Sequence, residues 1–144
     1  MASGITVSDE SLTTYKDLQL GKKHQYIIFK VSDDFKAIVV DKVGQKGCDY
    51  EKEFLPSIPD NEPRYIVYDF AYDTEEGRRN KIIFFLWNPD SDGVKSVRQK
   101  MIYSSSKKAI RDRLLGISVD LQVSDKTDLI YEEVHKSIAG NPNA

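Results

Sequence analysis

The feature that most constrains the fold is an uninterrupted apolar run near the middle of the chain, Ile82 to Trp87. Its residues do not alternate with polar ones, which is typical of a strand that has both faces covered. The run is also too short to cross a bilayer. A turn sequence, Asn88 to Gly93, follows it directly. The run therefore predicts an inner strand of a sheet with helices on both faces.

The other elements are predicted from periodicity and from end signals. Alternating apolar residues predict strands, and repeats at helical spacing predict helices. The first helix is expected to be capped by Ser8 and to end at Gly21. The resulting order predicts one α/β domain with a central mixed β-sheet between helices. Strands are predicted over 26–31, 37–43, 64–73, 81–87 and 119–123, a charged loop over 74–80, and further helical segments over 50–55 (closed by Pro56), 94–115 and 130–138 (ended by Gly140).

Basic residues are concentrated in and after the apolar run. From Arg78 to Arg113 the chain has ten Lys or Arg and three Asp, a net charge of +7; the whole chain carries −2, so the remainder carries −9. A basic element on an acidic body favours an acidic partner, which can be a protein surface, anionic lipid headgroups or a nucleic-acid backbone. The simpler interpretation, and the more frequent one for a charge run taken alone, is a solvated helix face.

Two apolar stripes lie on opposite sides of the helix predicted after the turn. Val97 and Met101 belong to one stripe, and Tyr103 and Ile110 belong to the other. A straight helix cannot pack both stripes against one core, so we expect a kink at residues 104–106, or a second helix capped by one of those serines. Met101 is then either a core residue or the centre of a docking face, and composition does not decide between them.

Catalytic chemistry has little support in the sequence. His24 and His135 are far apart in the chain, and the single cysteine, Cys48, lies outside any nucleophile motif. One cysteine cannot form an internal disulfide, which favours a reducing cytoplasm. Ser104 and Lys107 have the spacing of a Ser-x-x-Lys pair, but matches of this length occur by chance. Neither a catalytic group nor a cofactor is predicted.

The turn after the apolar run has part of a calcium-loop pattern. Asn88, Asp90, Asp92 and Gly93 stand at the first, third, fifth and sixth places of such a loop, with Gln99 at the twelfth. The motif needs Asp first and a bidentate Glu last, so we interpret the segment as a turn and predict no metal site. Nucleic-acid binding is not predicted either, because the aromatic residues lie in apolar strands rather than among Lys and Arg.

Six short motifs are spread in order over almost the whole chain. They resemble motifs of the ADF/cofilin family of actin-depolymerising proteins, and their order makes a chance resemblance very improbable. The resemblance implies one ADF-homology domain over 1–144, with a flexible arm at 1–7 and a flexible tail at 141–144. The motifs are MASGI at 1–5, RYIVYDF at 64–70, WNPD at 87–90, RQKMIYSSSK at 98–107, LGI at 115–117 and DLQ at 120–122.

The resemblance also implies a function. The family fold is a mixed sheet between helices, of the ADF-homology or gelsolin-like type, in agreement with the elements above. The implied activity is binding of actin monomers and filaments, with the ADP form favoured, together with severing and depolymerisation of filaments. The implied protein is a monomer without enzymatic activity, located in the cytoplasm, on the cytoskeleton and also in the nucleus. The competing class is an adaptor domain that binds phosphoinositide or actin and does not sever filaments.

Site residues follow from the resemblance by position. Met101 becomes the apolar centre of a docking face with a basic rim, and Ser3 becomes a site of regulatory phosphorylation. Contacts with both actin monomers and filaments are expected from Ser3, Gly4, Arg98, Lys100, Met101 and Ser106, filament-only contacts from Arg79 and Lys81, and binding of anionic phosphoinositide membranes from Arg98, Lys100, Lys107, Lys108, Arg111 and Arg113.

Two departures from the family pattern concern severing. Six residues, Ser91 to Ser96, stand where the family usually has three between the turn motif and the valine before Arg98. The terminal helix, in which relatives often carry several filament-binding cations, has only Lys136. These departures bear on the strength of severing and not on monomer binding.

Overall fold

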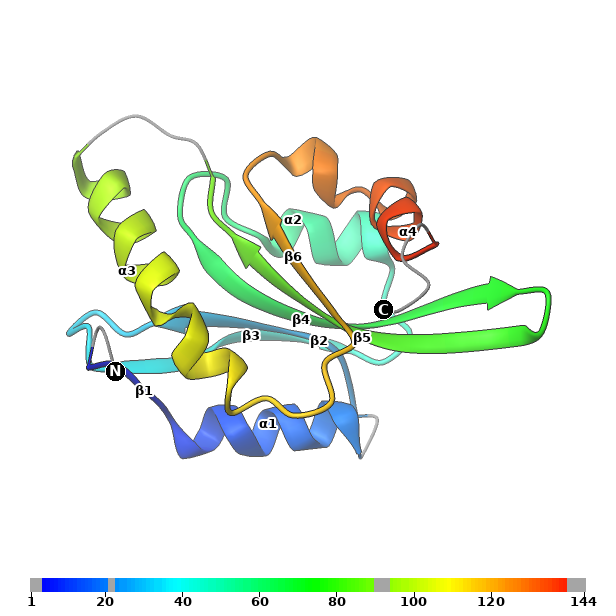
Figure 1. Ribbon diagram of the computed structural model, residues 1–144, viewed down its shortest axis with the longest axis horizontal. Coiled ribbons are helices and arrows are strands. Elements are labelled where there is room, and N and C mark those ends of the chain that lie inside the picture. The colour runs from blue at the N-terminus through cyan, green and yellow to red at the C-terminus, as the bar shows by residue number, and fades with distance from the viewer. Residues whose placement is uncertain (1–3, 21–22, 90–93, 140–144) are drawn as a thin grey trace.

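The computed structural model describes residues 4–20, 23–89 and 94–139, and its core is a mixed sheet (Figure 1). The strand order is β1-β3-β2-β4-β5-β6, in which β1 and β6 pair parallel to their neighbours and the inner pairs are antiparallel. The predicted fold class is confirmed. The strands are β1 (Thr6–Val7), β2 (His24–Val31), β3 (Ala37–Gln45), β4 (Arg64–Thr74), β5 (Gly77–Trp87) and β6 (Val119–Val123).

Helical segments cover both faces of this sheet. One face packs against α1 and α3, with Ile5 and Val7 in the same core, and we call it the α3 face. The other packs against η1, η2 and α4, and we call it the α4 face. The helical segments are α1 (Asp9–Gln19), the π-helical η1 (Tyr50–Phe54), α2 (Leu55–Ser57), α3 (Val94–Arg111), the 3-10 helix η2 (Lys126–Leu129) and α4 (Tyr131–Ala139).

The apolar run forms the inner strand that its composition predicts. Within β5, Ile83, Phe85 and Trp87 pack into the core on the α4 face, whereas Phe84 and Leu86 pack into the core on the α3 face. All five side chains are essentially fully buried. The predicted strand at 119–123 is β6, which lies at the edge of the sheet and pairs with β5 in parallel. Burial of both faces therefore explains why the run does not alternate.

The N-terminal segment differs from the flexible arm that we expected. Ile5 and Val7 are 2% and 7% exposed, and β1 pairs in parallel with the start of β3. The expectation is therefore wrong for residues 5–7, which belong to the core on the α3 face. Apolar residues at alternate positions signal this strand, although it is too short for the pattern to stand out. Residues 1–3 and the expected tail at 141–144 lie outside the described residues.

Helix α1 begins as predicted. The Ser8 hydroxyl accepts a hydrogen bond from the Ser11 backbone N–H at 3.1 Å, which caps the helix. The Ser11 hydroxyl donates to the Ile38 carbonyl at 3.1 Å, and Tyr15 and Leu18 are buried. The end expected at Gly21 lies outside the described residues.

Helix α3 is continuous from Val94 to Arg111, so a second helix capped at residues 104–106 is not formed, whereas the alternative of a kink stays a prediction. Tyr103 and Ile110 are buried on the sheet, whereas Val97 is 54% and Met101 67% exposed. Only one apolar stripe of the helix packs into the core, and the other is exposed to solvent. The expectation of a second helix failed because it assumed that both apolar stripes must be buried.

The predicted loop at residues 74–80 is also wrong, because this segment is the tip of a long hairpin. Strands β4 and β5 pair in register from Arg64 opposite Trp87 to Thr74 opposite Gly77, leaving a two-residue turn at Glu75 and Glu76. Gly77 has a φ of +121°, which favours glycine over any L residue. The hairpin projects from the body of the protein (Figure 1). Polar residues lie on both faces of this segment, so its sequence lacks the alternation that predicts a strand and favours a loop instead.

Smaller differences concern element ends. The helical turn predicted to close at Pro56 continues to Ser57, because proline at the start of α2 loses no helical hydrogen bond. The terminal helix begins at Tyr131, one residue after the predicted Ile130, and its expected end at Gly140 lies outside the described residues. The 3-10 helix η2 was not predicted.

Buried tyrosines make a pH prediction possible. Burial raises the pKa of the Tyr15 phenol to about 12, although the charge of Arg111 opposes the shift. Burial also raises the pKa values of Tyr50, Tyr65, Tyr68 and Tyr103. The folded state thus holds these protons more tightly than the unfolded state, in which tyrosine has a pKa of about 10.

The stability that these phenols contribute is full below about pH 10 and is lost as the pH rises through the folded-state values. We expect tyrosinate absorbance from this group to appear together with loss of circular dichroism, above about pH 10. In guanidinium chloride the same absorbance should appear near pH 10. Complete tyrosinate formation near pH 10 with unchanged circular dichroism would contradict this prediction.

Candidate functional site

One apolar stripe of α3 does not pack into the core and is exposed to solvent. Met101 and Val97 project from it, and Arg98 and Lys100 flank them. The guanidinium of Arg98 lies 5.1 Å from the ring centre of Phe35, which is itself partly exposed at the tip of the β2–β3 hairpin. We call Val97, Arg98, Lys100 and Met101 the α3 surface. It has an apolar centre and a basic rim.

Buried hydrogen bonds and an aromatic contact fix the position of α3 on the sheet. The Tyr103 hydroxyl accepts a hydrogen bond from the Val31 backbone N–H at 2.8 Å, and its ring lies 5.0 Å from that of Tyr65. The Tyr65 hydroxyl in turn donates to the Tyr103 carbonyl. These contacts join α3 to β2 and β4, so the α3 surface is presented by a rigid support.

Ser106 does not lie on this surface. Its side chain is fully buried, on the side of α3 that faces the sheet. It forms a hydrogen bond with Tyr65. Burial raises the pKa of the Tyr65 phenol, and this hydrogen bond opposes the rise. This burial does not support the prediction that Ser106 contacts a partner directly, and we reassign the side chain to the support of the helix. A serine in a Ser-Ser-Ser run carries no sequence signal that distinguishes the buried member from its neighbours.

Replacing Ser106 by alanine tests this reassignment. We expect Ser106→Ala to lower the free energy of unfolding by about 1 kcal/mol, because a buried hydrogen bond is lost. Partner affinity should change less than about twofold, the range expected of a side chain that is not in contact. Ser105→Ala, on the exposed side of the same helix, is the matched control. A large loss of partner affinity with unchanged stability would instead place Ser106 in the interface.

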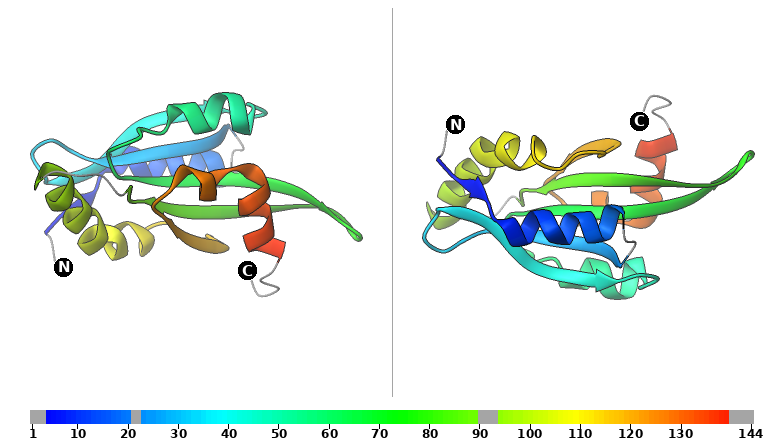
Figure 2. Two further views of the ribbon diagram at one scale, coloured as in Figure 1. Left: turned by 90° about the horizontal axis from the view of Figure 1, so that it is seen from above. Right: turned by 90° about the horizontal axis from the view of Figure 1, so that it is seen from below.

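The N-terminal segment lies beside the same helix. Figure 2 shows β1, which follows Gly4 and Ile5, beside α3 in both views. Gly4 is exposed and has a φ of +72°, and the buried Ile5 that follows fixes its position. The structure therefore brings Gly4 to the end of the protein that carries the α3 surface. Ser3 lies outside the described residues.

The residues assigned to filament contacts lie elsewhere. Arg79 and Lys81 are on β5, opposite Tyr72 and Phe70 of β4, in the outer half of the hairpin. Arg79 is 54% exposed and pairs with Glu76 at 2.6 Å. The hairpin extends away from α3 (Figure 1), and both residues belong to the α4 side of the sheet by the alternation of β5. The structure thus separates the two groups of cations onto different surfaces.

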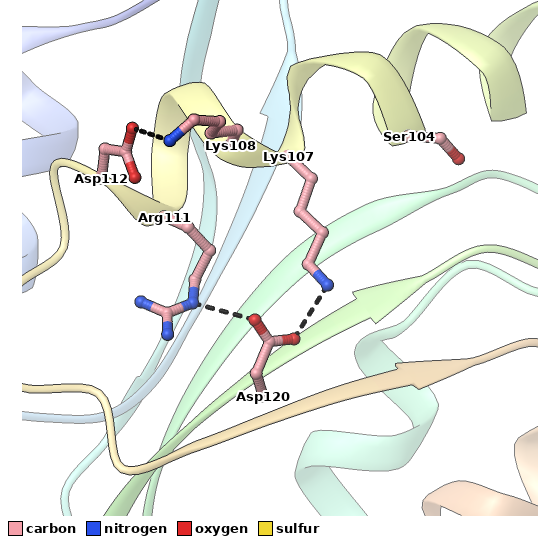
Figure 3. Close-up of a pocket in the computed structure, with 6 residues that line it drawn as sticks. All are labelled: Ser104, Lys107, Lys108, Arg111, Asp112 and Asp120. Carbon is pink, nitrogen blue, oxygen red and sulfur yellow. Dashed lines mark hydrogen bonds and ion pairs between the residues drawn. The ribbon is translucent and has the colours of Figure 1, made fainter.

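The C-terminal half of α3 forms a basic pocket of about 430 Å³ with β6 (Figure 3). Lys107 and Arg111 both contact the carboxylate of Asp120, with Nζ–Oδ1 at 3.0 Å and Nε–Oδ2 at 2.9 Å. Lys108 pairs with Asp112 at 2.9 Å on the outer side. Together with Ser104 these residues line what we call the Asp120 pocket. Asp120 was missed because its role depends on β6 lying beside α3, which no local pattern shows.

Arg113 does not join this pocket. It lies on a separate groove of about 390 Å³, between α1 and the turn after α3, with Leu20 and Leu115 exposed on its walls. The Tyr15 hydroxyl and the Gln19 side-chain amide both donate to the Leu115 carbonyl, which fixes this turn against α1. The predicted phosphoinositide set is therefore divided among the α3 surface, the Asp120 pocket and this groove.

The candidates for catalysis are not assembled into a site in the described part of the chain. The amine of Lys107 pairs with Asp120, and the Ser104 hydroxyl accepts instead from the Asn88 amide at 3.2 Å. Burial, followed by the nearby Glu53, raises the pKa of the Cys48 thiol and disfavours the thiolate.

Residues 4–20, 23–89 and 94–139 contain neither a group of metal ligands nor a membrane-spanning helix. Within these ranges, no three His, Cys, Asp or Glu side chains are grouped so that they could hold a metal ion. No helix in the same ranges is both long and apolar enough to span a bilayer. Three residues of the partial calcium loop, Asp90, Asp92 and Gly93, fall outside the description.

Known proteins resemble this chain in both sequence and structure. A family model for cofilin/tropomyosin-type actin-binding proteins matches residues 4–139. This chain belongs to the ADF/cofilin family. Actophorin of Entamoeba histolytica is 42% identical over 132 residues, covering 92% of this chain and 93% of that protein. Cofilin of Saccharomyces cerevisiae is 42% identical over 139 residues, covering 95% and 94%.

Solved structures agree with this assignment. The cofilin of Streptomyces griseoflavus superposes with a TM-score of 0.85 at 40% identity, over 96% of this ADF/cofilin chain and 99% of that one. Actin depolymerization factor 2 of Plasmodium berghei gives 0.81 at 29%, over 98% and 100%. The coactosin of Entamoeba histolytica, at 19% identity and 0.76, shows the shared fold alone. The resemblance inferred from the six motifs is confirmed, and the family is one of actin-binding proteins rather than of enzymes.

Proposed function

We propose that this protein binds actin monomers and filaments through the α3 surface and that it severs and depolymerises filaments. The observation that carries the proposal is the exposure of Met101 and Val97 beside Arg98 and Lys100 on a helix that is otherwise packed on the sheet. Apolar anchors inside a polar rim are the usual arrangement of interface hot spots. The names of the relatives, among them an actin-depolymerizing factor of Arabidopsis thaliana, support the same activity.

Filament binding requires contact with a second actin subunit, and the β4–β5 hairpin supports that role. It carries Arg79 and Lys81 on a surface remote from α3, so both surfaces can be occupied together. Lys136 of α4 lies 3.7 Å from Glu133, and with Glu132 the helix carries two acids against one lysine, a net charge of −1. The hairpin is therefore the main filament contact in this proposal.

Regulation and location complete the proposal. Ser3 precedes β1, which packs against α3, so a phosphate on Ser3 would bring roughly −1.5 to −2 charges towards a helix that binds an acidic protein. Such a charge would repel actin. The protein is a monomer that favours ADP-actin and acts on the cytoskeleton, in the cytoplasm and in the nucleus.

Phosphoinositide binding is the second function that we propose. Lys107, Lys108 and Arg111 line one pocket, and Arg98 and Lys100 extend the basic area along α3. Anionic headgroups attract surface cations by about 1 kcal/mol per Lys or Arg, with strong sensitivity to salt. Because this area overlaps the α3 surface, headgroups and actin should compete.

Co-sedimentation with actin filaments tests the first proposal. The wild-type protein should pellet with ADP filaments and raise the actin in the supernatant, and microscopy of immobilised filaments should show an increased frequency of breaks. Bovine serum albumin at the same concentration controls for trapping. Pelleting without released actin or breaks would favour a non-severing adaptor, and failure to pellet would overturn filament binding.

A further inference from the structure

Two cations of the Asp120 pocket are held by one internal carboxylate. Lys107 and Arg111 come from successive turns of α3 and approach opposite oxygens of Asp120, at 3.0 and 2.9 Å. Figure 3 shows both side chains converging on this carboxylate from the helix above β6. Each of the three side chains is about one-third exposed, so the group lies at the surface and can exchange partners with solvent ions. Asp120 occupies the position that an external anion would take.

The carboxylate satisfies only part of the donor capacity of these cations. Lys has three N–H donors and Arg has five, whereas Asp120 receives one contact from each. Within the described part of the chain, Arg111 donates a hydrogen bond through Nε, to Asp120, and Figure 3 draws no interaction of its terminal nitrogens with the other residues of the pocket. With Lys108 and Asp112 the pocket carries three positive and two negative side chains, a net charge of +1. A group with more oxygens and more charge can therefore bind where one carboxylate now sits.

A phosphate monoester has these properties. It carries roughly −1.5 to −2 charges near pH 7 and three acceptor oxygens, and it forms charge-assisted bonds with Arg and Lys. We propose that the Asp120 pocket binds a single phosphate group and that Asp120 acts as its internal competitor. This inference rests on the proposed phosphoinositide binding and specifies how that site is controlled.

The position of Asp120 on the fold suits a competitor that can be displaced. It lies on the edge strand β6 opposite Phe84 of β5, and the alternating Val119 and Leu121 anchor the strand on the α4 face. The backbone is thus held by the sheet while the carboxylate faces α3 at the surface. Without it, Lys107 and Arg111 would lose their shared ion pair, and the Arg111 guanidinium would be left 5.8 Å from the ring centre of Phe84. The carboxylate balances their charge in the unbound state and opposes any anion that is not strong enough to replace it.

Removing the charge of Asp120 should therefore tighten phosphate binding. We expect Asp120→Asn to bind inositol 1,4,5-trisphosphate, and vesicles containing phosphatidylinositol 4,5-bisphosphate, about five- to tenfold more tightly than wild type, because a like charge next to the phosphate is gone. Asp112→Asn changes the net charge equally, but Asp112 is 60% exposed and pairs only with Lys108. Although it also lines the pocket, it leaves the contacts of Asp120 with Lys107 and Arg111 in place, so it controls for net charge alone and should tighten binding by less than about twofold.

Two further variants keep the test independent of stability. Asp120→Glu retains the carboxylate and should bind like wild type. Lys107→Gln in the Asp120→Asn background should cancel the gain, because it removes one of the two phosphate ligands. Thermal midpoints show whether each variant is folded at the titration temperature. A variant that is unfolded at that temperature is replaced in the comparison by the Lys107→Gln single mutant. This mutant should bind both probes more weakly than wild type.

The two probes distinguish the source of the phosphate. Tightening for soluble inositol trisphosphate shows recognition of the phosphate group itself, and tightening for vesicles alone shows that the lipid surface is also needed. Equal gains for Asp120→Asn and Asp112→Asn, or no gain where wild type binds, would overturn the competitor role and leave phosphoinositide binding intact. Absence of binding to both probes by wild type and by Asp120→Asn would overturn the proposed phosphoinositide function itself.

Discussion

Replacing Arg98 and Lys100 together by alanine is expected to weaken binding to actin monomers and to filaments by about 2–5 kcal/mol. Both cations border the exposed Met101, and charged groups around a buried anchor are costly to remove when their partners on the other protein stay desolvated. A loss of this size lowers affinity by about 30-fold or more. Fluorescence titration of labelled monomers and co-sedimentation of filaments measure the two affinities separately.

The hairpin cations provide the matched comparison. Arg79→Ala with Lys81→Ala removes the same number of charges from a surface remote from α3. This double mutant should retain monomer binding and lose filament binding and severing, because a monomer offers no neighbouring subunit for the hairpin to reach. An equal loss of monomer affinity in the two double mutants would mean that one surface, not two, contacts actin.

Neither double mutant should unfold the protein. Arg98 loses a cation–π contact with Phe35, a contribution of about 0.5–1 kcal/mol at an exposed site. Arg79 loses a surface ion pair with Glu76, whose contribution is about 0–1 kcal/mol. Unchanged thermal midpoints would therefore assign the binding losses to the interface.

The parts of the fold that could be predicted from sequence are those with a strong local pattern. Burial on both faces of β5 follows from an apolar run without alternation, and the cap of α1 follows from Ser8. The two stripes of α3 were also visible in the sequence. Which stripe is buried was not, because this depends on the part of the sheet that the helix meets, where Tyr103 contacts Val31 and Tyr65.

The parts that could not be predicted depend on pairing between distant segments. Thr6 and Val7 form a strand only because the start of β3 is available to them, and the hairpin tip is strand only because β4 and β5 keep their register. Asp120 acquires its role from α3, with Arg111 nine residues away in sequence. Single-sequence patterns report local preference, whereas these features arise from tertiary contacts.

The candidate site also contains residues whose exposure agrees with the sequence prediction and one, Ser106, whose burial the sequence did not indicate. Arg98 and Met101 could be assigned by resemblance because a surface helix keeps its partner-facing residues at fixed positions along the helix. Ser106 was assigned in the same way and is buried, since position in a motif does not report which side of a helix faces the core. The structure was needed to separate the exposed residues of the motif from the buried ones.

Phe84→Ala is expected to have the largest effect on stability among these substitutions. Phe84 is fully buried at the centre of the α3 face, where its ring lies 5.9 Å from that of Tyr65. Truncating a buried phenylalanine typically costs 3–5 kcal/mol, a large share of the 5–15 kcal/mol that stabilises an ordinary domain. The urea midpoint should fall with little change in slope, and the thermal midpoint should fall by roughly 10 °C.

Phe84→Leu keeps most of the buried volume and should cost less than half as much, about 1–1.5 kcal/mol. Equal losses for Phe84→Ala and Phe84→Leu would contradict a cavity as the cause. In that case the aromatic contacts of Phe84 with Tyr65 and Arg111 would have to supply the stability instead.

Met101→Ala provides the complementary case, because it also truncates a large apolar side chain, but one that is 67% exposed. The free energy of unfolding should change by no more than about 0.5 kcal/mol, as for other surface substitutions. Actin affinity should nevertheless fall by about 1–2 kcal/mol or more, since an apolar anchor at the centre of an interface is lost. Phe84→Ala, measured well below its thermal midpoint, should show the reverse pattern, with lowered stability and nearly normal affinity. If Met101→Ala destabilised the fold as much as Phe84→Ala, the exposed stripe of α3 would be part of the core, and the docking role assigned to it would have to be abandoned.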